Sequence, residues 1–303
     1  MPTATEFLGY QFTNLGPLTT TYSPPPSCTT ATTDGIEFAK ADTPTFVFGW
    51  ESCSITTMGK CHPSGSQHDK IKGQAVKTGG MAVFDYFSPG LVCPHGWTTA
   101  GKLAYGDGST ITREGIFTTD DATPSYPFKG DEVWLNVLAS DETLAICCPS
   151  PNDHLSGWTA STAGICQSSI MPLTSATYTE FCQRRLPASL VATYYTVGTS
   201  VYSDPIRSIR TWDNPDDYAM TVPFTTGSPM LPVDPDNVIV QKKLHAVHMV
   251  YKEGDSKETG KTDPPSSGSD DDKNASSGLE ATKLGPVVAV VVGVLVGAGL
   301  LLH

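Results

Sequence analysis

Short runs of apolar, aromatic and β-branched residues recur along the chain up to about residue 252, and Gly, Pro, Asp or Ser bound each run. Runs of this length between turn residues are typical of β-strands. The predicted strands are Thr45–Trp50, Ala82–Phe87, Glu132–Ala139, Glu142–Cys148, Ala192–Tyr202, Ile206–Trp212 and Leu244–Lys252. We therefore expect a mainly β ectodomain, an antiparallel sheet or sandwich, over residues 1–252.

Apolar residues become scarce between Glu253 and Lys283, where Pro, Ser, Gly and charged residues dominate. A segment of this composition cannot bury enough apolar surface to offset the entropy that it would lose on ordering. Residues 253–283 are therefore expected to form a disordered acidic stalk.

No residue from Leu284 to Leu302 is charged, and Val dominates the stretch. As one hydrophobic helix it would rise about 28 Å, close to the roughly 30 Å thickness of the hydrocarbon core of a bilayer. Residues 284–303 are therefore predicted to be a membrane segment or the tail of a GPI signal.

The residues around this segment favour GPI processing over a permanent transmembrane helix. A GPI signal needs small residues at the cleavage site, then a polar spacer and a hydrophobic tail. Ser276 begins one suitable triplet and Asn274 another, so both are candidate attachment residues. Asn274 also begins an Asn-Ala-Ser sequon and is a glycosylation candidate. Only His303 follows the segment, whereas a permanent span usually has Lys or Arg on its cytoplasmic side.

The first residues, Met1–Leu18, lack the basic region and the unbroken apolar run of a secretory signal peptide. Two interpretations stay open. Either a signal peptide precedes the start of this chain, or the hydrophobic segment is a tail anchor and residues 1–283 face the cytosol.

Charge argues against one class of partner. The chain of 303 residues has 31 Asp and Glu against 19 Lys and Arg, which gives a net charge of −12. No basic stripe is present to neutralise phosphates, so we expect no nucleic-acid partner.

Eight cysteines lie in the first 182 residues: Cys28, Cys53, Cys61, Cys93, Cys147, Cys148, Cys166 and Cys182. None forms the Cys-x2-Cys pair that is typical of zinc sites, so we expect no metal. An even set in a Gly-rich and Pro-rich β region predicts disulfides in an oxidising compartment, with the connectivity left open. Cys147 and Cys148 should leave opposite faces of a strand, so each should bond a different distant cysteine.

Four stretches carry a family resemblance: Ser23–Cys28, Ser88–Gly101, Thr143–Ser150 and Leu244–Asp255. Together they resemble a group of uncharacterised fungal cell-surface proteins. The resemblance implies a Cys-rich ectodomain, a polar stalk and a C-terminal membrane segment. Members usually have a signal peptide and often a cytoplasmic tail, and neither is visible here. The resemblance implies a location and no biochemical activity.

No catalytic or cofactor motif is present in the sequence: neither a Gly-x-Ser-x-Gly elbow, nor His-Glu-x-x-His, nor a P-loop, nor a dinucleotide-binding glycine pattern. We therefore expect no cofactor. His245 and His248 would lie on opposite faces of the predicted strand, which argues against shared metal binding. The acidic residues Asp234 and Asp236 are better explained by turn capping than by calcium.

Aromatic residues give a binding function its only support. Trp97 and Trp158 lie beside glycines in predicted loops and are the candidates for stacking on sugars, although core packing is the simpler role for each Trp.

The sequence thus predicts a structural or interaction protein, anchored at the extracellular face of the plasma membrane or in the cell wall of a fungus. Cell-wall polysaccharide is a candidate partner besides the membrane. Two alternatives remain: an extracellular carbohydrate-active enzyme or sugar-binding module, and a tail-anchored protein that faces the cytosol.

Overall fold

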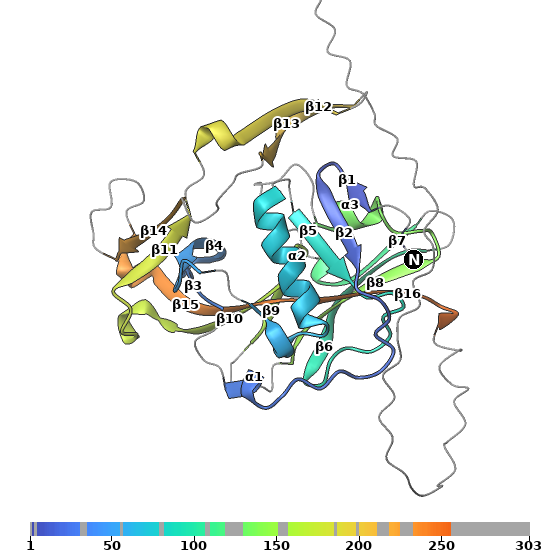
Figure 1. The fold of residues 1–303 in the computed structure, drawn as a ribbon, viewed down its shortest axis with the longest axis horizontal. Helices are drawn as coiled ribbons and strands as arrows, with labels where there is room; N and C mark the ends of the chain where they lie inside the picture. Colours follow the sequence, from blue (N-terminus) through green and yellow to red (C-terminus); the bar gives the residue numbers. More distant parts are fainter. Residues whose placement is uncertain are drawn as a thin grey trace, which may run out of the picture. The chain divides into compact units, whose positions relative to one another are not determined.

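The computed structural model describes residues 2, 5–30, 35–54, 57–78, 82–106, 110–118, 130–150, 157–184, 187–197, 200–210, 218–224 and 233–255. Within them the chain is mainly β, and β-sheets dominate the compact unit Met1–Lys261 (Figure 1). Among the strands that the structure describes, every pair is antiparallel except β2 and β5, which pair parallel. The predicted mainly β, antiparallel fold is confirmed.

The largest sheet has seven strands in the order β14-β11-β4-β3-β15-β10-β9. Its strands are β3 (Ile36–Lys40), β4 (Thr43–Trp50), β9 (Thr159–Ser161), β10 (Ile165–Pro172), β11 (Glu180–Arg184), β14 (Ala219–Pro223) and β15 (Val238–His245). This sheet carries a phenylalanine-rich core in which the Phe38 ring lies 4.9 Å from the Phe224 ring and 5.1 Å from the Tyr178 ring.

A four-stranded sheet, β16-β8-β6-β7, is joined directly to the large one along the chain. It contains β6 (Trp97–Tyr105), β7 (Ile111–Gly115), β8 (Glu142–Pro149) and β16 (Val247–Lys252). Only Ala246 separates β15 from β16, so one extended segment, orange to red in Figure 1, leaves the first sheet and enters the second. This crossing brings residues of both sheets close together.

The remaining strands form two smaller sheets. β1 (Glu6–Phe7), β2 (Tyr10–Asn14) and β5 (Ala82–Tyr86) make a three-stranded sheet. β12 (Val191–Val197) and β13 (Ser200–Ile209) pair with each other, and Tyr194 and Tyr195 on β12 are 50% and 56% exposed. Both side chains are largely open to solvent where the pairing of this hairpin shifts register.

The described helices are α1 (Ser27–Thr30), α2 (Gly65–Thr78), α3 (Gly130–Leu135) and the 3-10 turns η1 (Gly59–Cys61), η3 (Ile116–Thr118), η4 (Leu173–Ser175), η5 (Ala188–Leu190) and η7 (Pro235–Asn237). α2 is the longest of them and lies against β5 and η1. Its sequence carries few apolar residues, so the hydrophobic pattern did not predict it.

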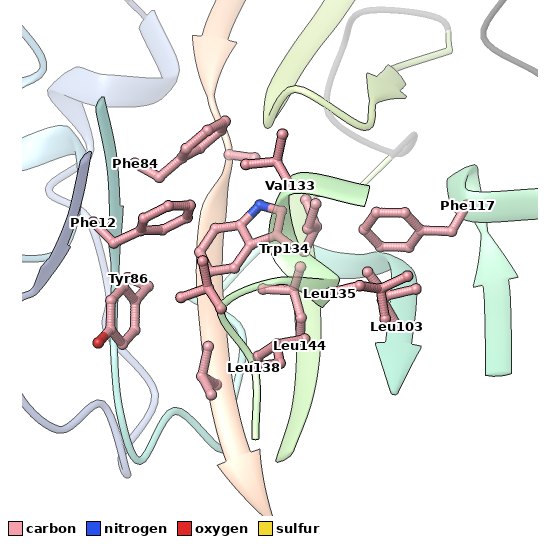
Figure 2. Packing of buried hydrophobic residues seen from close by; sticks show 14 of the residues in the cluster. Phe12, Phe84, Tyr86, Leu103, Phe117, Val133, Trp134, Leu135, Leu138 and Leu144 are labelled. Carbon is pink, nitrogen blue, oxygen red and sulfur yellow. The ribbon is translucent and has the colours of Figure 1, made fainter. Parts of the chain in front are cut away.

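The prediction of a strand at Glu132–Ala139 is wrong, because α3 occupies its first half. Asp131 and Glu132 in the first turn suit a helix N-terminus, and a short apolar run fits a buried helix as well as a strand. The helix places Trp134, which is fully buried, in the largest hydrophobic core, the main core, where the rings of three aromatic residues pack against it (Figure 2). These residues are Phe12, Phe84 and Tyr86.

Four disulfides pair all eight cysteines: Cys28–Cys61, Cys53–Cys182, Cys93–Cys147 and Cys148–Cys166. The neighbours Cys147 and Cys148 bond different distant partners, as the alternation of a strand predicts. Such bonds are consistent with an oxidising, extracellular environment. Because the Cys53–Cys182 bond closes a separation of 129 residues, it removes much freedom from the unfolded chain.

No helix among the described residues is long and apolar enough to cross a membrane. The predicted stalk beyond Asp255, the predicted membrane segment and the residues Asn274 and Ser276 lie outside the described part of the chain.

Candidate functional site

A cluster of four histidines, His62, His68, His245 and His248, gathers around Asp85 where the sheets meet; we call it the histidine cluster. The five residues come from different elements. His62 follows η1, His68 lies on α2, Asp85 is on β5, His245 ends β15 and His248 is on β16.

Asp85 is the centre of the histidine cluster. Its Oδ2 lies 2.6 Å from Nδ1 of His68, and its Oδ1 lies 3.3 Å from Nζ of Lys72, one turn further along α2. Because an ionised carboxylate only accepts hydrogen bonds, Nδ1 of His68 carries the proton and donates it. The Asp85 backbone oxygen also lies 3.2 Å from Nδ1 of His248.

The imidazole rings pack on one another. The His62 and His68 rings stack with centroids 4.3 Å apart, and the His245 ring meets His68 edge-on at 5.1 Å. His248 lies 5.3 Å from the Trp134 ring. A Cβ on Gly164 would collide with the His248 ring, so only glycine fits over it.

Local contacts hold His62 in place. The Asp69 carboxylate on α2 accepts hydrogen bonds from the backbone N–H groups of Met58 and Gly59, at 2.7 and 2.9 Å. The Cys28–Cys61 disulfide ties down the residue next to His62. The turn before α2 is thus clamped at two points, which fixes His62 against His68.

Burial dominates the electrostatics of the histidine cluster. Burial of the ring, aided by the neighbouring His68, lowers the pKa of His62 to about 4. Burial also lowers the pKa of His248 to about 4 and, with Lys72, holds the pKa of His245 well below its ordinary value. Burial by itself would raise the pKa of Asp85, but the hydrogen bond from His68 and the charge of Lys72 keep it below its ordinary value.

The His68–Asp85 pair has the chemistry of a carboxylate that orients a general base, but it is closed to a substrate. The two side chains are 2% and 4% exposed. Nε2 of His68 and Nε2 of His248 have no hydrogen-bond partner in the described structure. No group of three or more His, Cys, Asp or Glu in the described segments is arranged to hold a metal ion. The cluster is therefore a buried polar core.

A second buried network lies on the large sheet and is called the glutamate network. Glu37 is fully buried, and its Oε1 accepts hydrogen bonds from the side-chain amides of Gln167 and Gln241, at 2.6 and 2.7 Å. Nζ of Lys243 lies 3.6 Å from the other carboxylate oxygen. These contacts join strands β3, β10 and β15.

The large sheet also carries a surface groove of about 310 Å³, the Phe46 groove. Its lining residues are Lys40, Thr43, Phe46, Phe48, Asp234 and Asn237. Phe46 is 46% exposed, and its ring meets the ring of Phe48 edge-on at 5.4 Å. The sequence did not point to this groove, because the apolar run Thr45–Trp50 predicted only a strand.

The sequence-predicted sugar-stacking residues do not line the Phe46 groove. Trp97 and Trp158 are partly buried and pack against the main core. Their role in stacking on sugars stays a prediction. Asp234, which does line the groove, caps η7 by accepting a hydrogen bond from the Asp236 backbone N–H, so turn capping is confirmed there.

The prediction that His245 and His248 lie on opposite faces of one strand is wrong. The strand ends at His245, and β16 begins at Val247 in another sheet. The break at Ala246 lets both rings approach the same cluster, and a single sequence does not reveal such a crossing.

No protein-family model, curated protein or solved structure matches this chain.

Proposed function

We propose that this chain is a membrane-anchored extracellular protein of a fungal cell surface or wall, with a structural or binding role. The four disulfides carry the proposal, because eight paired cysteines suit secreted proteins and cytosolic thiols stay reduced. The hydrophobic residues 284–303, the polar stretch before them and the family resemblance support an anchor and a location.

Binding is favoured over catalysis. The His68–Asp85 pair is closed to solvent, whereas the Phe46 groove is open and lined by aromatic and polar side chains. A sugar-binding module therefore agrees better with these observations than a carbohydrate-active enzyme does.

The compartment is tested by producing the full chain with and without a secretory signal ahead of Met1. We expect a protease-resistant fold without free thiols only for the exported form, since each lost disulfide typically costs about 2 to 4 kcal/mol. A cooperative fold in reductant, with all eight thiols titrating, would favour the tail-anchored, cytosol-facing alternative.

The anchor is tested separately on intact cells. Phosphatidylinositol-specific phospholipase should release the protein if a GPI anchor is attached at Ser276 or Asn274. Recovery of the peptide 287–302 in the mature protein would instead indicate a permanent membrane helix.

A further inference from the structure

Strand β4 leaves its ladder at the Phe46 groove. In the pairing with β3, Phe38 lies opposite Gly49 and Ala39 lies opposite Val47. The next residue, Lys40, lies opposite Thr43. Residues 44–46 therefore have no partner in the β3 register and form a bulge. Bulges commonly re-aim side chains at functional positions, and here the bulge exposes Phe46.

The bulge is tied to the glutamate network. The Gln241 amide that donates to Glu37 also donates to the backbone oxygen of Pro44, at 3.1 Å. Because Glu37 and Gln241 are buried, this bond fixes the bulge from inside the protein. The position of Phe46 is thus built into the fold.

The Phe46 groove combines two kinds of surface. Phe46 offers an exposed aromatic ring that packs edge-on against Phe48. The other lining residues, Thr43, Asn237, Asp234 and Lys40, carry a hydroxyl, an amide, a carboxylate and an ammonium. The carboxylate has lone pairs beyond the one that caps η7, and the ammonium has donors beyond its ion pair with Asp42.

This combination suits one ligand chemistry. A pyranose ring has a face of C–H bonds that packs on an aromatic ring, and its hydroxyls need donors and acceptors around the edge. The volume lies at the lower end of small-ligand sites, which suits a short sugar segment. Lys40 is already paired with Asp42, so the groove has little attraction for an anionic ligand.

We propose that the Phe46 groove is a binding site for neutral saccharides, with Phe46 as the stacking residue. The inference rests on the proposed function and names its ligand class. The same chemistry occurs in wall polysaccharide and in the glycans of glycoproteins.

The test is calorimetric titration of the exported full chain in detergent. The probes are β-glucan and chitin oligosaccharides for the wall, and a high-mannose glycopeptide for glycoproteins. We expect at least one probe to bind, and Phe46→Ala to weaken that binding about tenfold. Binding of the glycopeptide alone would indicate that the natural ligand is a glycoprotein glycan, and it would still support a saccharide ligand.

The matched control is Trp50→Ala, on the same strand. Trp50 is 37% exposed and does not line the groove, so its removal should leave the affinity unchanged. Absence of binding to every probe, or an equal loss in both variants, would overturn the proposal. If Trp97→Ala or Trp158→Ala weakened binding and Phe46→Ala did not, the proposal would also be overturned, and the binding site would lie at those tryptophans.

Failure of this proposal is separable from failure of the proposed function. Protease treatment of intact cells reports whether the chain is outside the cell, whatever the titrations show. If the protein is exposed at the cell surface but binds none of the three probes, only the sugar site is refuted.

Discussion

The histidine cluster and the glutamate network both place charged or titratable side chains inside the protein, but they respond to acid differently. In the first, His62 and His248 have pKa values lowered to about 4, so both are neutral in the folded state at neutral pH. In the second, the donors to Glu37 include the amides of Gln167 and Gln241, which keep their hydrogens at any pH. The packing of the histidine cluster is therefore coupled to pH, whereas the β4 bulge depends on amide hydrogen bonds.

The largest effect should come from acid acting on the histidine cluster. In the unfolded chain, histidine takes up a proton near pH 6.5. In the folded protein, His62 and His248 are protonated only near pH 4, so the unfolded state binds more protons between these two pH values. The free energy of unfolding should fall as the pH drops from about 6.5 to about 4, by roughly 3 kcal/mol for each of His62 and His248. Urea titrations at stepped pH measure this slope.

A variant assigns the slope to the cluster. His248→Phe removes one titrating ring, so the stability of this variant should depend less steeply on pH between about 6.5 and 4. Because the pKa of Asp85 is lowered, its carboxylate stabilises the fold at every pH above its ordinary pKa of 3.8. This contribution is lost only when the pH falls below 3.8, so it does not affect the slope between pH 6.5 and 4. An unchanged slope in His248→Phe would show that other groups cause the acid sensitivity.

The next effect concerns Asp85 itself. Asp85→Ala leaves the buried His68 and the partly buried Lys72 without their carboxylate, which should cost about 3 to 5 kcal/mol of unfolding free energy. Urea unfolding at pH 7 measures the loss. If the alanine variant does not fold, Asp85→Asn, which should lose less stability, is measured in its place.

The control for Asp85 is Asp141→Ala, which removes only the exposed ion pair with Lys252 and should leave the unfolding midpoint unchanged. If both variants lost the same stability, the loss would come from removing any acidic side chain and not from the histidine cluster.

The sequence predicted the mainly β class and fewer than half of the described strands, and very little of the two networks. Leu144–Cys148 is apolar at consecutive positions, and the predicted strand Glu142–Cys148 is the buried strand β8, as expected. α2 escaped prediction because it turns His68 and Lys72 toward Asp85 in place of aliphatic residues. A helix that buries polar side chains has no hydrophobic period to detect.

The sites themselves depend on long-range pairing. Glu37 meets Gln241 across 204 positions of sequence, and His248 meets Asp85 across 163. Neither pair has a local motif. The Phe46 bulge likewise arises from a register shift between β3 and β4, which a single sequence does not specify.

A smaller effect is expected when the glutamate network is broken. Gln241→Met keeps the length of the side chain but removes the donor to Glu37 and to the Pro44 oxygen. We expect a loss of about 2 kcal/mol at pH 7, because the buried Glu37 carboxylate and the Pro44 oxygen each lose a hydrogen-bond donor. Hydrogen exchange should also quicken at the bulge, and unchanged exchange there would contradict the role of this amide in fixing the bulge.

The smallest effect should come from the clamp beside His62. Asp69→Ala removes the acceptor for the backbone N–H groups of Met58 and Gly59, which resembles the loss of a helix cap and should cost about 1 kcal/mol. Because the turn that holds His62 against His68 would loosen, water should reach the His62 ring more easily and its pKa should rise towards 6.5. Histidine NMR titration checks this, with Asp141→Ala as the control. If the pKa of His62 stayed near 4 in Asp69→Ala, burial of the ring would depend on the surrounding sheets and not on the clamp.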